Sequence, residues 1–126
     1  MPVSNEDRKI VEQVFEAMQA REKGEEKMVS LFADDAVLTE PFTGQPRTHR
    51  GKEAIRTFFR GAVSQIAPDM LLKLDRLDMD GARVRADWTC TTSVLPGPMR
   101  GHDLYTIQNG KIKTAEFVVT EMPEMK

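Results

Sequence analysis

The 126-residue chain carries 18 Lys plus Arg against 20 Asp plus Glu, a net charge of −2, and its length fits one domain over residues 1–126. Both signs of charge are interspersed along the chain, which argues against the concentrated basic face of a nucleic-acid-binding protein. No apolar run approaches the ~20 residues of a membrane span, and the amino terminus lacks the order of a signal peptide, so we expect a soluble cytoplasmic protein.

The amino-terminal quarter predicts two helices. Ser4 is followed three residues later by Asp7, as at the start of a capped helix. Apolar residues then recur at helical spacing, and we expect this helix to stop near Gly24. A shorter helix around Met28 follows it.

The next segment predicts a strand and a loop. Asp34-Asp35 is expected to form a turn, and residues 36–39 a short strand. Pro41 ends that strand or confines it to an edge, because proline cannot donate to a ladder hydrogen bond. Residues 43–50 are polar and predict a loop.

A third, amphipathic helix begins near Gly51. It ends before Pro68, which disfavours helical geometry at the preceding residue. Its apolar stripe is wide and consists of Ile55, Phe58, Phe59, Ala62, Val63 and Ile66.

From residue 70 onward the apolar period changes to that of strands. Leu72 and Leu74 alternate with charged residues, and turns are predicted at 80–81, 96–98 and 109–110, between strands over 84–90, 104–108 and 112–119. Helices followed by an antiparallel meander indicate an α+β fold, with the helices on one face of a curved sheet.

Four short motifs carry a family resemblance. They are Phe-Ala-Asp-Asp-Ala at 32–36, Glu40-Pro41, the helix start His49-x-Gly51-Lys52-Glu53-Ala54-Ile55 and the hairpin Asn109-Gly110-Lys111-Ile112. Together they resemble the nuclear transport factor 2-like superfamily, above all its SnoaL-like polyketide cyclases and ketosteroid isomerases. The resemblance implies a cystatin-like α+β barrel, a cone-shaped curved antiparallel sheet wrapped around N-terminal helices. It also implies a homodimer formed through the sheet, and an apolar small-molecule ligand with no metal or organic cofactor.

Glu40 is the first candidate for acid/base chemistry, because it aligns with the catalytic aspartate of ketosteroid isomerases, which also precedes a proline. A cavity around Glu40 would raise its pKa by desolvation and let the carboxylate take a proton alpha to a carbonyl. The alternative is that Glu40 lies in water at a strand edge and pairs with Arg47 or Arg50.

The chain departs from the isomerase pattern at the two positions that would stabilise an oxyanion. The tyrosine position falls at Glu16 and the protonated-acid position at Arg100, which argues against steroid isomerisation by that constellation. Arg100 could instead stabilise a negative oxygen near Glu40, or be a rim arginine. His102 shares the predicted strand face of Arg100 and is a candidate general acid/base, while Asp103 and Tyr105 fall on the opposite face.

Aromatic and Met side chains are the candidate ligand contacts, although such stripes more often fill a core. The predicted substrate-binding set is Phe15, Met18, Phe58, Phe59, Trp88 and Phe117. Cys90, the only cysteine, reads as an inert buried thiol.

Two functions of different classes follow from these residues. The first is a cofactor-independent isomerase, cyclase or hydrolase that acts on an apolar carbonyl or epoxide compound through Glu40, Arg100 and His102. The second is a non-catalytic ligand-binding or protein-assembly module of the same fold.

Overall fold

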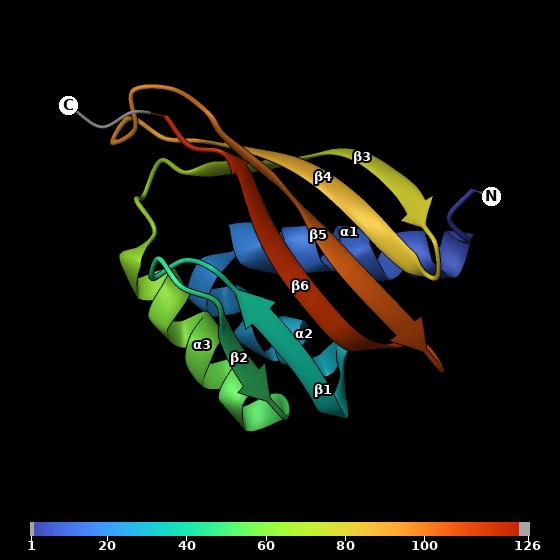
Figure 1. Ribbon diagram of the computed structural model, residues 1–126. Coiled ribbons are helices and arrows are strands. Elements are labelled where there is room, and N and C mark those ends of the chain that lie inside the picture. The colour runs from blue at the N-terminus through green and yellow to red at the C-terminus, as the bar shows by residue number, and fades with distance from the viewer. Residues whose placement is uncertain (1, 124–126) are drawn as a thin grey trace.

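A computed structural model describes residues 2–123 and has an α+β fold (Figure 1). The helices are α1 (Asn5–Gln19), α2 (Glu25–Ser30) and α3 (Lys52–Gln65), with a short 3-10 turn at Arg21–Gly24. The strands are β1 (Phe32–Glu40), β2 (Arg47–Arg50), β3 (Leu71–Asp80), β4 (Arg83–Thr91), β5 (Met99–Gln108) and β6 (Lys111–Glu121). Within these residues no helix combines the length and the apolar character that crossing a bilayer would require.

The sheet has the strand order β2-β1-β6-β5-β4-β3 and curves over α1 and α3 (Figure 1). This arrangement confirms the predicted α+β class and the curved sheet wrapped around helices. Two details differ from the expectation. The β1 and β6 strands pair in parallel, and β2 and β3 are the two ends of the strand order, so the sheet is open rather than a closed barrel.

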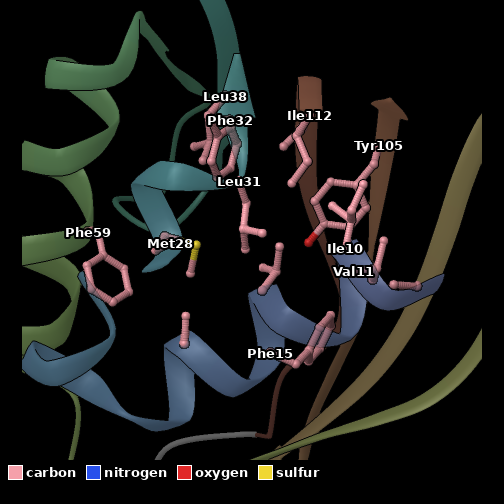
Figure 2. Close-up of a cluster of buried hydrophobic side chains, with 14 of the residues drawn as sticks. Ile10, Val11, Phe15, Met28, Leu31, Phe32, Leu38, Phe59, Tyr105 and Ile112 are labelled. Carbon is pink, nitrogen blue, oxygen red and sulfur yellow. The ribbon is translucent and has the colours of Figure 1, made fainter. Parts of the chain in front are cut away.

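The predicted start of α1 is confirmed, because the Ser4 hydroxyl accepts a hydrogen bond from the Asp7 amide at 3.1 Å. The α1 helix buries its apolar face against the sheet, where Ile10, Val11 and Phe15 enter the core. Figure 2 shows these side chains converging with those of β1, β5 and β6 between the helices and the sheet. The concave face of the sheet is therefore the interior of the protein.

Three strand boundaries differ from the sequence prediction. The β1 strand begins at Phe32, so Asp34-Asp35 lies within it rather than in a turn, at an irregularity in its pairing with β6. Residues 47–50, predicted as loop, form β2 and pair with β1. The β5 strand begins at Met99 rather than Leu104. The second difference matters for function, because the pairing of β1 with β2 places Arg47 directly beside Glu40.

Candidate functional site

A pocket of about 580 Å³ lies between the concave face of the sheet and helices α1 and α3. Its wall is mainly apolar, as expected of a small-molecule site. The lining residues are Val14, Phe15, Met18, Phe42, Thr43, Arg47, His49, Thr57, Phe58, Gly61, Ala62, Gln65, Ile66, Met70, Leu72, Trp88, Cys90, Met99, Asp103 and Phe117.

Three aromatic rings form one side of this pocket. Phe42 stacks on Phe58 with ring centroids 6.5 Å apart and an interplanar angle of 9°. Phe117 lies 6.1 Å from Phe42 and 6.4 Å from Phe58. Because Phe42 is 49% exposed while Phe117 is half-buried, Phe42 lies at the mouth of the pocket. Planar apolar groups of a ligand would find ring faces and edges to contact there.

Asp103 is the carboxyl group in the pocket wall, and it is 7% exposed. Its Oδ1 accepts a hydrogen bond from Trp88 Nε1 at 2.9 Å, and its Oδ2 accepts one from the Tyr105 hydroxyl at 2.7 Å. Burial raises the pKa of Asp103 to about 7, although both hydrogen bonds act to lower it. Near neutral pH this carboxyl can therefore both donate and accept a proton.

Gly101 explains how the Trp88 indole reaches Asp103. Trp88 and Gly101 are direct cross-strand partners on β4 and β5. A Cβ atom at Gly101 would lie 2.6 Å from Trp88 Cζ2 and 2.1 Å from the Val118 carbonyl oxygen. Both approaches are closer than real side chains allow, so only glycine leaves room for the indole across the strand.

Glu40 is fully buried, but it lies behind the pocket wall rather than in it. Its Oε1 accepts the Phe42 amide at 2.8 Å, and its Oε2 accepts Arg47 Nε and contacts Arg47 Nη2, each at 2.9 Å. His49 Nε2 also lies 2.9 Å from Oε2. Burial pushes the pKa of Glu40 upward, but the bonds from His49, the Phe42 amide and Arg47 outweigh it, and the pKa lies below its ordinary value.

The expectation that the pKa of Glu40 is raised is wrong, because its pKa is lowered. Its position also differs from both predicted placements, in a cavity or in water at a strand edge. The side chain is buried, yet it is paired with Arg47 as the water-exposed alternative required. An ionised carboxylate has no proton to donate, so His49 Nε2 is the donor in their hydrogen bond. Glu40 thus holds Arg47 and His49, and these two residues line the pocket.

Glu40 and Asp103 belong to separate parts of the pocket rather than to one carboxyl pair. Asp103 pairs with Phe117 across β5 and β6, and Thr39, the neighbour of Glu40, pairs with Glu116, the neighbour of Phe117. Two strand spacings therefore separate the carboxyl-bearing positions, roughly 9 Å. Because residues in register point to the same face, Phe117 lies between them on the inner face.

Arg100 and His102, predicted to join Glu40, lie elsewhere. Arg100 is exposed and forms an ion pair with Glu121. His102 is placed between Asp87 and Val118 in the sheet register, and neither it nor Arg100 lines the pocket. Burial lowers the pKa of His102, and within the described part of the chain its buried Nδ1 has no hydrogen-bond partner. The alternation along β5 was predicted correctly, but the inward face is that of Asp103 and Tyr105.

Most of the predicted ligand contacts lie in the pocket wall. These are Phe15, Met18, Phe58, Trp88 and Phe117. Phe59 is the exception, because it is 2% exposed within the hydrophobic core and does not line the pocket. Asp103, Arg47 and His49 were not among the site residues predicted from the sequence, and all three line the pocket.

Comparison with known proteins supports this picture of the fold. No curated protein matches the chain. A proposed ketosteroid isomerase from Kribbella flavida superposes with a TM-score of 0.73 at 17% identity, over 100% of this chain and 86% of that one. A proposed polyketide cyclase from Sinorhizobium meliloti gives 0.72 at 21% identity, over 87% and 94% of the two chains. An NTF2-like protein of unknown function from Mesorhizobium loti gives 0.76 at 18% identity, over 96% and 98%.

The family is established by sequence as well as by fold. The model of the SnoaL-like domain matches residues 11–115, a range that runs from α1 to β6 and contains every titratable group of the pocket wall. The chain therefore belongs to the SnoaL-like domain family, and its fold is similar to that of the NTF2-like protein from Mesorhizobium loti.

Proposed function

We propose that this protein binds an apolar carbonyl compound in the pocket and moves a proton on it, with Asp103 as the acid/base. The observation that carries the proposal is the Asp103 carboxyl, which is buried in the wall of an open apolar pocket and has a pKa of about 7. A group that titrates near the working pH is the most effective proton carrier, because neither protonation state is scarce.

The geometry supports a simple reaction. The Asp103 carboxylate takes a proton from the carbon alpha to the substrate carbonyl, which leaves an enolate and the carboxylic acid. The acid then returns the proton to the same or another carbon, and the second case is an isomerisation. Trp88 and Tyr105 hold the carboxyl in one orientation during both steps through their hydrogen bonds. No other reactant is consumed.

His49 is a further polar group of the pocket wall. Its Nε2 is engaged by Glu40, so Nδ1 is the ring nitrogen left to contact a ligand. In this arrangement Glu40 is a positioning residue that acts through His49 and Arg47, since its own carboxylate lies outside the pocket wall. The homodimer and the cytoplasmic location stay predictions.

A non-catalytic ligand-binding protein is the second candidate. It is favoured by the hydrogen bonds of the two buried carboxyls, because Asp103 already accepts from Trp88 and Tyr105 and Glu40 already binds Arg47 and His49. A polar network that is satisfied without a substrate can serve folding alone.

The first experiment is a thermal-shift screen against steroids, aromatic polyketides, terpene epoxides and acyl lactones. A ligand at ~100 times its dissociation constant adds ~2.7 kcal/mol to the free energy of unfolding, which raises Tm by several degrees in a domain of this size. We expect a shift from one class of carbonyl compound. A panel that leaves Tm unchanged would remove the support for a ligand pocket.

The second experiment tests proton transfer without knowledge of the product. Carbonyl compounds that raise Tm are incubated with the protein in D2O, and loss of the alpha C–H signal is followed by proton NMR. Binding without accelerated exchange would favour the non-catalytic candidate.

A further inference from the structure

The charges of the pocket wall are unbalanced. Within the described residues, its titratable side chains are Arg47, His49, Cys90 and Asp103. Burial raises the pKa of the Cys90 thiol, so this group is neutral near pH 7. The Asp103 carboxyl is mainly protonated below its pKa of about 7. The permanent charge in the wall is therefore the Arg47 guanidinium.

Glu40 pairs with the Arg47 guanidinium from behind the pocket wall and leaves part of the guanidinium accessible to a ligand. Both of its contacts with the guanidinium, from Nε and from Nη2, go to the single oxygen Oε2. Glu40 is completely buried, whereas the Arg47 side chain is 50% exposed. The ion pair thus presents its positive end to the pocket, and among the residues that the structure describes no bond occupies Nη1 of Arg47, so its donors remain for a ligand. Arginine is well suited to such a role, because its planar fork can bind two carboxylates along different edges.

His49 and the aromatic rings adjoin this cation. The His49 ring lies 4.8 Å from the Phe58 ring, at an interplanar angle of 32°. Phe42, whose amide binds Glu40, stacks on the same Phe58. Because Glu40 bonds directly to the Phe42 amide, Arg47 and His49, it fixes the guanidinium, the imidazole ring and the aromatic surface side by side at the mouth.

We propose that the ligand of this pocket is an apolar carboxylic acid, whose carboxylate binds Arg47 at the mouth, beside His49, while its carbon skeleton lies among Phe42, Phe58 and Phe117. This inference rests on the proposed function, since it names the class of compound that the same pocket binds. A carboxylate fits better than a phosphate dianion, because Arg47 has already committed two of its three nitrogen atoms to Glu40. An amine at the same place would be repelled by the guanidinium.

The test compares naphthoate with the naphthamide that carries its amide at the same ring position. The two compounds share shape and differ in charge. Isothermal titration at about pH 6 gives both dissociation constants while Asp103 is mainly protonated. We expect the acid to bind about tenfold or more tightly than the amide, the usual range for a charge-assisted hydrogen bond. The Arg47→Gln variant should lose that preference and keep its affinity for the amide within about twofold, whereas Arg47→Lys should keep part of the preference.

Arg50→Gln is the matched control, because Arg50 is an exposed arginine on the same strand and does not line the pocket. It should leave both constants unchanged. Thermal unfolding of each variant shows whether it is folded before titration. Equal affinity for acid and amide would overturn the carboxylate site and leave the ligand pocket standing. A preference that survives Arg47→Gln would overturn the role of Arg47, and binding of neither compound to the wild type would count against the pocket as well.

Discussion

Glu40 and Asp103 are both buried carboxyls on the inner face of one sheet, and their pKa values shift in opposite directions. Burial raises the pKa in both cases. Glu40 offsets it with an imidazole, a backbone amide and a guanidinium, whereas Asp103 has only an indole N–H and a phenol hydroxyl. The comparison teaches that burial and the neighbours' hydrogen bonds and charges together decide which buried carboxyl becomes an acid/base.

The same comparison assigns different roles to the two groups. Glu40 stays ionised and orders its surroundings, since Arg47, His49 and the Phe42 amide all converge on it. Asp103 has a proton that it can exchange near neutral pH. In the proposed mechanism, the residue that aligns with the catalytic aspartate of ketosteroid isomerases is a positioning group, and the proposed proton carrier lies roughly two strands away.

The largest expected effect separates the two carboxyls by activity. Asp103→Asn should slow alpha-proton exchange of a bound carbonyl compound by about 10²–10⁴-fold, the usual contribution of a general acid/base. Glu40→Gln should slow it by less than about tenfold, because it acts only through His49 and Arg47. Proton NMR in D2O measures both rates. The reverse order of the two losses would restore Glu40 as the catalytic group.

The next effect concerns stability, which Asp103 and Glu40 should make depend on pH in opposite directions. Native Asp103 binds a proton up to about pH 7, whereas in the unfolded chain it does so only below about pH 4. The free energy of unfolding should therefore fall by about 2–4 kcal/mol as the pH rises between these values, and this fall should be absent in Asp103→Asn.

Glu40 should give the opposite slope. Its pKa is lowered in the native state, so its contribution is present above about pH 4.5 and lost as the pH falls through the native pKa. At about pH 7, Glu40→Gln should cost about 2 kcal/mol, because Arg47 and His49 lose a buried ionic partner. Urea unfolding of wild type and both variants between about pH 2 and pH 8 tests the pair. Parallel pH profiles for the two variants would contradict it.

The fold was largely predictable from the sequence, because long periodic segments carry clear signals. The α3 stripe and the hairpin residues at 80–81 and 109–110 indicated these elements by local chemistry alone. The SnoaL-like resemblance then supplied the arrangement. Residues 47–50 form a strand without any apolar alternation, so nothing local predicted β2.

The site was less predictable, because it depends on which strand face points inward. On β5 both faces carry apolar side chains, since Tyr105 faces the core while Leu104 is buried on the other face. A period-two pattern therefore shows which residues share a strand face, but not which of the two faces points toward the core. The role of Glu40 depended on β2, whose pairing brings Arg47 opposite Glu40.

A smaller effect tests why the pKa of Asp103 is no higher than about 7. Tyr105→Phe removes the buried hydroxyl that donates to Oδ2 and keeps the ring in the core. The carboxylate loses a donor, so the pKa of Asp103 should rise by about one unit. Carbon-13 NMR titration of the side-chain carboxyl measures the change. A fall in pKa would mean that Tyr105 does not stabilise the ionised form.

The smallest expected effect isolates the backbone contribution to Glu40. Phe42→Ala removes a half-exposed ring but keeps the amide that donates to Oε1. The free energy of unfolding should change by less than about 1 kcal/mol. The fall in stability at low pH that is due to Glu40 should occur at the same pH as in the wild type. Ligand affinity should nevertheless fall about threefold to tenfold, since a stacking surface at the mouth is lost. If Phe42→Ala shifts the pH at which Glu40 loses its contribution to stability, the ring, and not only the amide, shields the carboxylate of Glu40 from water.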